Sequence, residues 1–263
     1  MPIDCPIELP RITDEEMRSV DYAVMSHVFA THNELGRLAD EVVYQEKLAR
    51  LLIAAGIEAT TEVPIGLSFR DFSARLEMDL VVEQKVIYEL KATAALLPTH
   101  ESQLLSYMYL TNATHGKLIN FKNPSVQSKF INTNLTTENR QHFDMNLTEY
   151  RGESGLVDLI RELIADWGTG LNAALYRRAL LQCWGNETEP EQLLPMISAG
   201  HQIGRQRFHL LCTDTALGVT TYKEPAKDSC TAFKKLLAAS PLKTMQWLNI
   251  THGKVTLSTI TKD

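Results

Sequence analysis

Residues 77–91 read E-M-D-L-V-V-E-Q-K-V-I-Y-E-L-K, and this stretch decides the fold of the first half of the chain. Two apolar runs, residues 80–82 and 86–88, flank the polar residues Glu83, Gln84 and Lys85. Short apolar runs on either side of a few polar residues are typical of two β-strands joined by a tight turn. The stretch therefore predicts a β-hairpin whose loop is residues 83–85.

Three charged side chains of this hairpin are predicted to lie together. Counting outward from the loop, antiparallel pairing sets Asp79 opposite Glu89, and Lys91 shares their face. Directly opposed like charges destabilise a sheet by up to about 1 kcal/mol. A divalent cation would reverse that cost, and carboxylate oxygens suit Mg²⁺ or Mn²⁺, with the lysine beside the metal. The alternative from these residues alone is an exposed hairpin of alternating charge.

The D-x9-E-x-K spacing resembles the catalytic hairpin of the PD-(D/E)XK nuclease superfamily. The surrounding sequence resembles one branch of it, the bacterial GxxExxY proteins. The motifs that carry this resemblance are L-G-R-L-A-D-E-V-V-Y (residues 35–44), L-L-P-T-H-E-S-Q-L-L-S-Y (96–107) and H-G-K-L-I-N-F (115–121). The resemblance covers about residues 20–133. One position departs from the pattern, because Leu38 stands where the family has its naming glycine, while Gly36 is kept.

The resemblance implies a metal-dependent nuclease, and we expect its substrate to be DNA. Asp79, Glu89 and the backbone carbonyl of Leu90 would bind Mg²⁺, for which Mn²⁺ would substitute. Lys91 would position the attacking water or neutralise developing charge. Glu41 would assist a second metal ion or orient Lys91.

The helix expected after the hairpin supplies a further candidate. Gln103 and Tyr107 have the Q-x-x-x-Y spacing that resembles a motif of RecB-like members of the superfamily, where the glutamine supports the active site. His100 lies on the same helix face as both. Tyr44, three residues after Glu41, is expected to pack against the core or orient that glutamate. We therefore expect Gln103 to belong to the catalytic group.

The order of elements predicts an α/β nuclease-like core, a mixed β-sheet flanked by helices, over residues 1–150. Its expected elements are helices at 13–33, 39–55 and 98–111, strands at 57–66, 73–82, 86–92 and 116–121, and a short element around residue 130. Polar residues 133–141 and 151–155 suggest a boundary. An α+β domain is expected over residues 151–263, with helices at 156–166, 170–183 and 227–239, strands at 205–212 and 215–222, and a hairpin of 244–250 with 255–260.

Composition and charge limit the class of protein. The chain has 263 residues, 44% of them hydrophobic, with no apolar run near the ~20 residues that span a bilayer and no signal-peptide pattern at its start. We expect a soluble, cytoplasmic protein that does not bind membranes. Residues 1–150 carry a net charge of −8 and residues 151–263 one of +2, within a total of −6.

An acidic nuclease domain attracts phosphates poorly, so metal ions and local basic residues must help. We therefore expect residues 151–263, where Arg205 and Arg207 are candidates, to bind nucleic acid, a protein partner or a second copy of the chain. Two alternatives stay open. One is a non-catalytic nucleic-acid-binding or assembly subunit that retains the fold. The other is an effector nuclease that is silent until a partner or ligand engages residues 151–263. DNA or RNA, strand preference and endo- or exonuclease action are not decided by the sequence.

Overall fold

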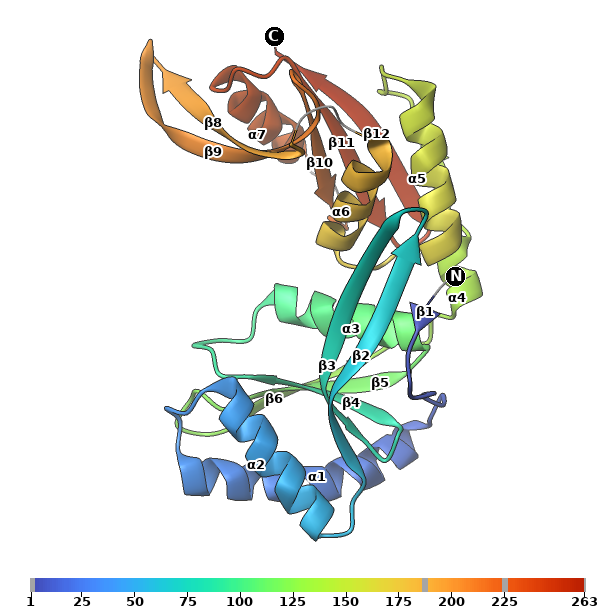
Figure 1. The fold of residues 1–263 in the computed structure, drawn as a ribbon, viewed down its shortest axis with the longest axis vertical. Helices are drawn as coiled ribbons and strands as arrows, with labels where there is room; N and C mark the ends of the chain where they lie inside the picture. Colours follow the sequence, from blue (N-terminus) through green and yellow to red (C-terminus); the bar gives the residue numbers. More distant parts are fainter. Residues whose placement is uncertain (1–2, 186–188, 224–226, 263) are drawn as a thin grey trace. The chain divides into compact units, whose positions relative to one another are not determined.

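The computed structural model describes residues 3–185, 189–223 and 227–262. The chain divides into two compact units (Figure 1). The N-terminal unit comprises the chain up to Ser68 together with Ser73–Thr137. The C-terminal unit comprises Phe69–Phe72 together with the chain from Glu138 onward.

The N-terminal unit is a mixed sheet with strand order β1-β2-β3-β4-β5-β6. Strands β4 and β5 pair in parallel, whereas β3–β4 and β5–β6 pair antiparallel. The elements are β1 (Ile3–Asp4), α1 (Asp14–Leu35), α2 (Glu41–Ala54), β2 (Ala59–Phe69), β3 (Phe72–Val82), β4 (Val86–Lys91), α3 (Pro98–Thr111), β5 (His115–Asn120) and β6 (Gln127–Asn132).

The predicted hairpin is confirmed as β3 and β4. Val82 pairs with Val86, and the Lys85 N–H donates to the Val82 carbonyl at 3.0 Å. Glu83 and Gln84 both have positive φ, 54° and 48°. Positive φ at both central residues is the mark of a type I′ turn, whose twist matches that of paired strands. The observed pairs have the register that a loop of residues 83–85 predicts.

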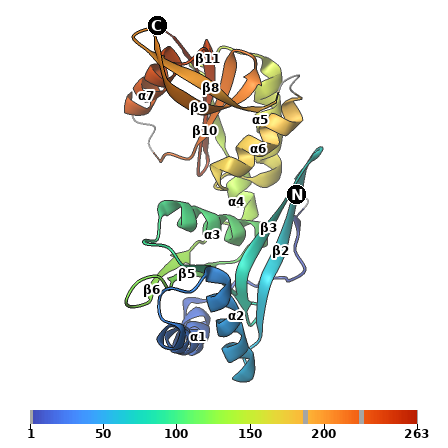
Figure 2. The same ribbon diagram turned by 60° about the vertical axis from the view of Figure 1, so that its left-hand side comes forward.

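Helices cover both faces of this sheet, α1 and α2 on one face and α3 on the other (Figures 1 and 2). Helix α1 begins with a capping box, in which Thr13 and Glu16 each accept from the other's backbone N–H. The core between α1, α2 and the sheet is apolar, and each fully buried aliphatic side chain contributes roughly 1.5–3 kcal/mol. Its members include Val24, Val28, Leu48, Leu52, Leu80, Val82, Val86, Tyr88 and Leu90.

Tyr44 holds the turn that contains Leu38, the position where the resembled pattern has a glycine. The Tyr44 hydroxyl donates to the Gly36 carbonyl at 2.8 Å and accepts from the Ala39 N–H at 3.2 Å. Its ring stacks on Phe121 with 4.4 Å between centroids. Gly36 has φ of 67°, which favours glycine, whereas Leu38 is 79% exposed and has no positive φ. A leucine therefore fits at position 38 without distorting this turn.

The C-terminal unit contains a second mixed sheet, with strand order β7-β12-β11-β10-β9-β8. Strand β10 pairs in parallel with β11, and β12 in parallel with β7. The elements are α4 (Thr137–Gln141), which begins one residue before the unit, β7 (Asp144–Asn146), α5 (Ser154–Trp167), α6 (Ala173–Trp184), β8 (Glu191–Ser198), β9 (His201–Cys212), β10 (Thr215–Thr220), α7 (Lys227–Ala238), β11 (Thr244–Thr251) and β12 (Lys254–Thr261).

The tip of the β2–β3 hairpin packs within this C-terminal unit. Trp167 is fully buried, and the rings of Phe69, Phe72 and Tyr176 lie 6.2, 5.8 and 6.1 Å from it between centroids. Buried aromatic clusters of this kind contribute both area and ring geometry to stability. The hairpin tip is therefore part of the core of the C-terminal unit.

The fold class is confirmed as mixed α/β, with two mixed sheets flanked by helices. The short strands β1 and β7, helix α4 and strand β8 were not predicted. The predicted division into domains at residue 150 stays a prediction. The compact units change over between Thr137 and Glu138, because β7 pairs with β12 of the second sheet. Among the described residues, no helix has the length and apolar character that crossing a membrane requires.

Candidate active site

Four charged side chains converge at the end of strand β4. Glu89 and Lys91 are on β4, Asp79 is on β3 and Glu41 is the first residue of α2. The Lys91 Nζ lies 2.8 Å from Glu89 Oε1, 3.2 Å from Glu41 Oε1 and 3.4 Å from Asp79 Oδ2. It also donates to the Leu90 carbonyl at 2.6 Å. The structure thus brings together every oxygen donor that the sequence proposed as a metal ligand.

Backbone groups hold two of the carboxylates in place. The Leu90 N–H donates to Asp79 Oδ2 at 2.7 Å, and the Ala92 N–H donates to Glu41 Oε2 at 3.2 Å. The two carboxylates are therefore fixed relative to β4 before any ligand arrives.

Gln45 is a positioning residue that the sequence reasoning missed. It lies one turn after Glu41 on α2, is 7% exposed, and donates from Nε2 to the Asp79 carbonyl at 2.7 Å. The spacing of Glu41 and Gln45 places both on one face of α2. The partner lies 34 residues away, so only this shared face could have suggested the contact.

Asn120, at the end of β5, was also missed. It is fully buried and pairs in register with Lys91. Its side chain donates to the Thr93 carbonyl at 2.8 Å and accepts from the Thr93 N–H at 3.1 Å. Asn120 therefore fixes the chain just after Lys91.

Burial shifts the titration of this cluster. The pKa of Glu89 is raised to about 8 by burial and by the charge of Asp79, although Lys91 lowers it. Burial and Glu41 also raise the pKa of Asp79, against the opposing effect of Lys91. Burial lowers the pKa of Lys91, but the carboxylates outweigh burial and raise it overall. The lysine is thus held charged, while Glu89 is protonated in much of the metal-free protein at neutral pH.

The oxygens of Glu89 provide a test of whether a metal ion fits. Glu89 is 0% exposed, its Oε2 has no hydrogen-bond partner among the described residues, and its Oε1 has only the Lys91 ammonium. A buried carboxylate without partners is costly unless a cation compensates it. Oxygen-only donors suit Mg²⁺ or Mn²⁺. The residues present therefore fit a hard divalent cation.

No ready-made metal site of three or more carboxylate, histidine or cysteine side chains is found in the part of the chain that the structure describes. The Lys91 side chain lies among the oxygens of the candidate site. Its ammonium lies within 3.4 Å of all three carboxylates and of the Leu90 carbonyl, in the space where these oxygens converge.

Gln103 approaches this cluster through Tyr107. Gln103 Nε2 donates to the Tyr107 hydroxyl at 2.8 Å. The pKa of Tyr107 is raised to about 12, by burial first and then by the charge of Glu89. No described contact joins Gln103 directly to the carboxylates. His100 instead accepts from the Leu97 N–H at 3.1 Å, at the start of α3.

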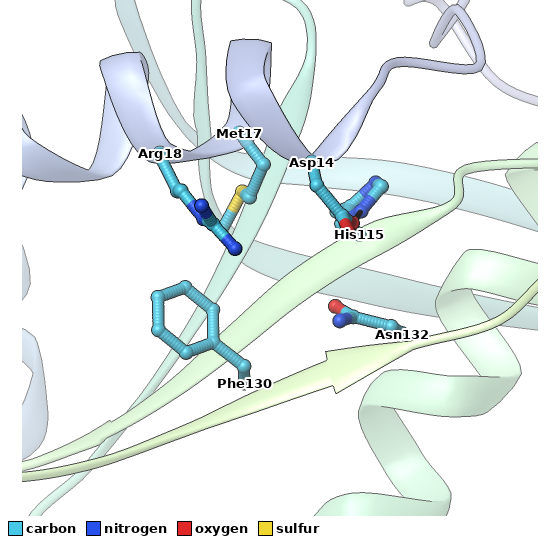
Figure 3. A pocket seen from close by; sticks show the side chains of 6 residues that line it. All are labelled: Asp14, Met17, Arg18, His115, Phe130 and Asn132. Carbon is cyan, nitrogen blue, oxygen red and sulfur yellow. Dashed lines mark hydrogen bonds and ion pairs between the residues drawn. The ribbon is translucent and has the colours of Figure 1, made fainter.

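A cavity of about 200 Å³ lies elsewhere in the N-terminal unit, between α1 and strands β5 and β6 (Figure 3). Asp14, Arg18, His115 and Phe130 are among its lining residues, and none of the four converging side chains is. His115 Nε2 is 2.8 Å from Asp14 Oδ1. This cavity is therefore separate from the candidate active site.

Known protein families and solved structures include partial matches to this chain. No curated protein is significantly similar to this chain. A crystal structure of SSO0001 aligns with 20% sequence identity and a TM-score of 0.30, over 47% of this chain and 62% of the other. Residues 18–132, which include all four converging side chains, match the model of the PD-(D/E)XK nuclease superfamily, and this match suggests a nuclease.

Proposed function

We propose that this chain is a metal-dependent nuclease that hydrolyses phosphodiester bonds, with DNA as its expected substrate. The observation that carries the proposal is the convergence of Glu41, Asp79, Glu89, Lys91 and the Leu90 carbonyl at the end of β4. The superfamily match over residues 18–132 supports the same reading. Membership of the GxxExxY branch remains a proposal that rests on the motifs around the hairpin.

Asp79, Glu89, Glu41 and the Leu90 carbonyl would hold Mg²⁺, with Mn²⁺ as a substitute. When bound, such an ion polarises a phosphate and lowers the pKa of a water molecule. Glu89 would give up its proton on loading, because a metal ligand must be deprotonated.

Lys91 would perform two tasks in turn. In the metal-free protein its ammonium lies 2.8–3.4 Å from oxygens of Glu89, Glu41 and Asp79 and compensates the charge that they carry. On metal binding it would leave this position and place its charge beside the phosphate that is cleaved. A preorganised cation stabilises negative charge that develops in the transition state.

The remaining residues would orient this group. Gln45 and Asn120 hold the backbone at Asp79 and after Lys91. Gln103 holds the Tyr107 hydroxyl, whose raised pKa keeps it a hydrogen-bond donor at neutral pH. We propose that Tyr107 donates to Glu89 or to substrate as the lysine moves.

The test is a cleavage assay with Mg²⁺ or Mn²⁺ on linear, circular, single-stranded and double-stranded DNA and on RNA. Asp79→Asn, Glu89→Gln and Lys91→Met are expected to lose cleavage, while Lys254→Met removes an exposed charge of the C-terminal unit and serves as the control. Cleavage by the parent and not by the site variants would support the enzyme. Binding of nucleic acid by the parent without cleavage would instead favour a non-catalytic subunit. Cleavage that appears only after a partner or ligand is added would favour the effector reading.

A further inference from the structure

The C-terminal unit contains a pocket where strands β9 and β10 separate. The two strands pair at Thr215 with Cys212 and at Ala216 with Leu210, and the register shifts between these pairs. Beyond Ala216, the described residues of β10 make no further pairing with β9, although β10 stays paired with β11 as far as Thr220. The opening between the strands is a cavity of about 220 Å³, which we call the β9–β10 pocket.

Hydrogen bonds and strand pairing with neighbouring strands fix both walls of this pocket. On the β10 side, Thr220 Oγ1 accepts from Trp247 Nε1 at 2.8 Å and donates to Asn249 Oδ1 at 2.7 Å. On the β9 side, Arg207 and His209 lie in the segment that pairs with β8. The separation of the strands is therefore built into the sheet.

The polar lining of the pocket is basic. Arg177 comes from α6, and Arg207 and His209 come from β9. Within the described residues, Glu191 is the carboxylate paired with this group, 2.7 Å from Arg207 and 3.4 Å from His209. Two guanidinium groups and an imidazole thus face a single carboxylate.

Within this basic group, the Nε of Arg177 lacks a hydrogen-bond partner among the described residues. Its Nε is buried and makes no hydrogen bond within residues 3–185, 189–223 and 227–262. Burial lowers the pKa of Arg177, and burial together with the charge of Arg177 lowers the pKa of His209. A buried donor without an acceptor is unfavourable, so an anion in the pocket would satisfy it.

The rest of the lining is apolar, and Phe208, Phe233, Leu236 and Met245 contribute to it. The volume of about 220 Å³ is below the roughly 300–1,000 Å³ typical of sites for drug-sized ligands. The occupant must therefore be a small molecule, or one end of a larger one, with an anionic head and a short apolar or aromatic body.

We propose that the β9–β10 pocket binds a phosphomonoester, with the phosphate against Arg177 and Arg207 and the body against Phe233 and Met245. A carboxylate has two oxygens in one plane, which a single guanidinium fork satisfies. A phosphomonoester has three terminal oxygens and a charge of about −1.5 to −2, which suits groups that approach from both α6 and β9. This chemistry is shared by a free mononucleotide and by the 5′-phosphorylated end of a nucleic acid strand.

The experiment is isothermal titration calorimetry on the full-length protein in chelator, which keeps metal-bound phosphate out of the candidate active site. The probes are inorganic phosphate, acetate, adenosine monophosphate, and a trinucleotide with either a 5′-phosphate or a 5′-hydroxyl. Arg177→Gln and Arg207→Gln test the site. Arg161→Gln is the control, because Arg161 is an exposed arginine of α5 in the same unit and does not line the pocket.

Adenosine monophosphate should bind the parent more tightly than inorganic phosphate or acetate does. Arg177→Gln or Arg207→Gln should weaken it at least about tenfold, equal to about 1.4 kcal/mol, and Arg161→Gln less than about twofold. If the trinucleotide binds only with its 5′-phosphate and only when Arg177 is present, the pocket also accepts the end of a nucleic acid strand. If it does not bind, the ligand is a free phosphomonoester. Equal losses in all three variants, no binding by the parent, or acetate binding as tightly as the ester would overturn the proposal. Because Arg177→Gln removes a buried unpaired donor, its melting temperature should not fall, and Arg207→Gln decides the matter if Arg177→Gln misfolds.

Discussion

At the scale of single residues, Lys91 makes more contacts within the candidate site than any other side chain described there. Its ammonium is surrounded by oxygens of Glu41, Asp79, Glu89 and the Leu90 carbonyl. These are the atoms proposed to hold the metal, so the ammonium and the metal ion compete for the same oxygens. That competition can be measured separately from catalysis.

Lys91→Met should uncouple metal binding from cleavage. We expect cleavage to fall by about 10²-fold or more, because a preorganised charge is lost. Mn²⁺ should bind at least as tightly as to the parent, since the competing ammonium is gone. In chelator the variant should lose about 3–5 kcal/mol of stability, the cost of leaving partners of a buried ion pair uncompensated. Calorimetry and urea unfolding, with Lys254→Met as control, would check this. Loss of Mn²⁺ binding would show that Lys91 supports the site in another way.

Glu89 should make the stability of the metal-free protein depend on pH. Its folded pKa is raised to about 8, well above the ordinary glutamate pKa of 4.5. The folded state therefore holds this proton more tightly, so its contribution is fully present below about pH 4.5 and is lost as pH rises through 8. The slope for one proton is at most about 1.4 kcal/mol per pH unit.

Glu89→Gln replaces the protonated form with a neutral side chain of similar shape. In urea unfolding with chelator, we expect this variant to match the parent near pH 4.5, to become the more stable of the two as pH rises, and to differ most above pH 8. Glu46→Gln, an exposed change on α2, should follow the parent at every pH. Parallel curves for the parent and Glu89→Gln would show that Glu89 does not carry this proton.

Part of the site could be predicted from sequence because local pairing determines it. A loop of residues 83–85 sets the register of Asp79, Glu89 and Lys91, and the observed pairs Val82–Val86 and Leu80–Tyr88 follow that register. Glu41 was reached only through resemblance, since it joins from a different element. Gln45 and Asn120 escaped prediction because their hydrogen-bond partners lie 34 and 27 residues away.

At the scale of elements, helix α2 supplies the site with both a carboxylate and a support. Glu41 begins the helix, and Gln45 one turn later holds the backbone of β3. The orientation of α2 therefore determines where Asp79 and Glu41 meet. Outer residues of this kind commonly alter metal affinity or activity by about 10–100-fold.

Gln45→Leu should weaken the metal site without touching a ligand. It leaves the Asp79 carbonyl without its partner, which costs about 1–3 kcal/mol of stability. We expect Mn²⁺ affinity and cleavage to fall by about tenfold or more. Gln182→Leu is the control, because it removes an exposed hydrogen bond from a glutamine amide to a backbone carbonyl, that of Asp71, in the C-terminal unit. If Gln45→Leu lost stability but kept full Mn²⁺ affinity, its role would be structural only.

The element that sequence patterns missed most clearly is β8. Its sequence E-Q-L-L-P-M-I-S contains Pro195, and a proline argues against a central strand. Strand β8 lies at the edge of its sheet, where one side needs no ladder partner and proline is tolerated. Edge position depends on the whole sheet order, so the local pattern could not supply it.

At the scale of the whole molecule, the unfolding of the two units can be followed by different signals. All three tryptophans, Trp167, Trp184 and Trp247, belong to the C-terminal unit, whereas the candidate metal site belongs to the N-terminal unit. Tryptophan fluorescence therefore follows one unit, and Mn²⁺ acts on the other. The hairpin β2–β3 has residues in both units.

Thermal unfolding of the full-length protein should separate the units. Mn²⁺ at tenfold excess over its Kd should stabilise the N-terminal unit by about 1.4 kcal/mol, and shift a circular-dichroism transition without moving the fluorescence transition. Trp167→Ala should destabilise the C-terminal unit by about 3–5 kcal/mol, because it empties the space between Phe69, Phe72 and Tyr176. Trp184 and Trp247 remain to report this change. The Mn²⁺-dependent transition should stay where it is in the parent. A single transition that both Mn²⁺ and Trp167→Ala move would mean that the hairpin makes the two units unfold as one.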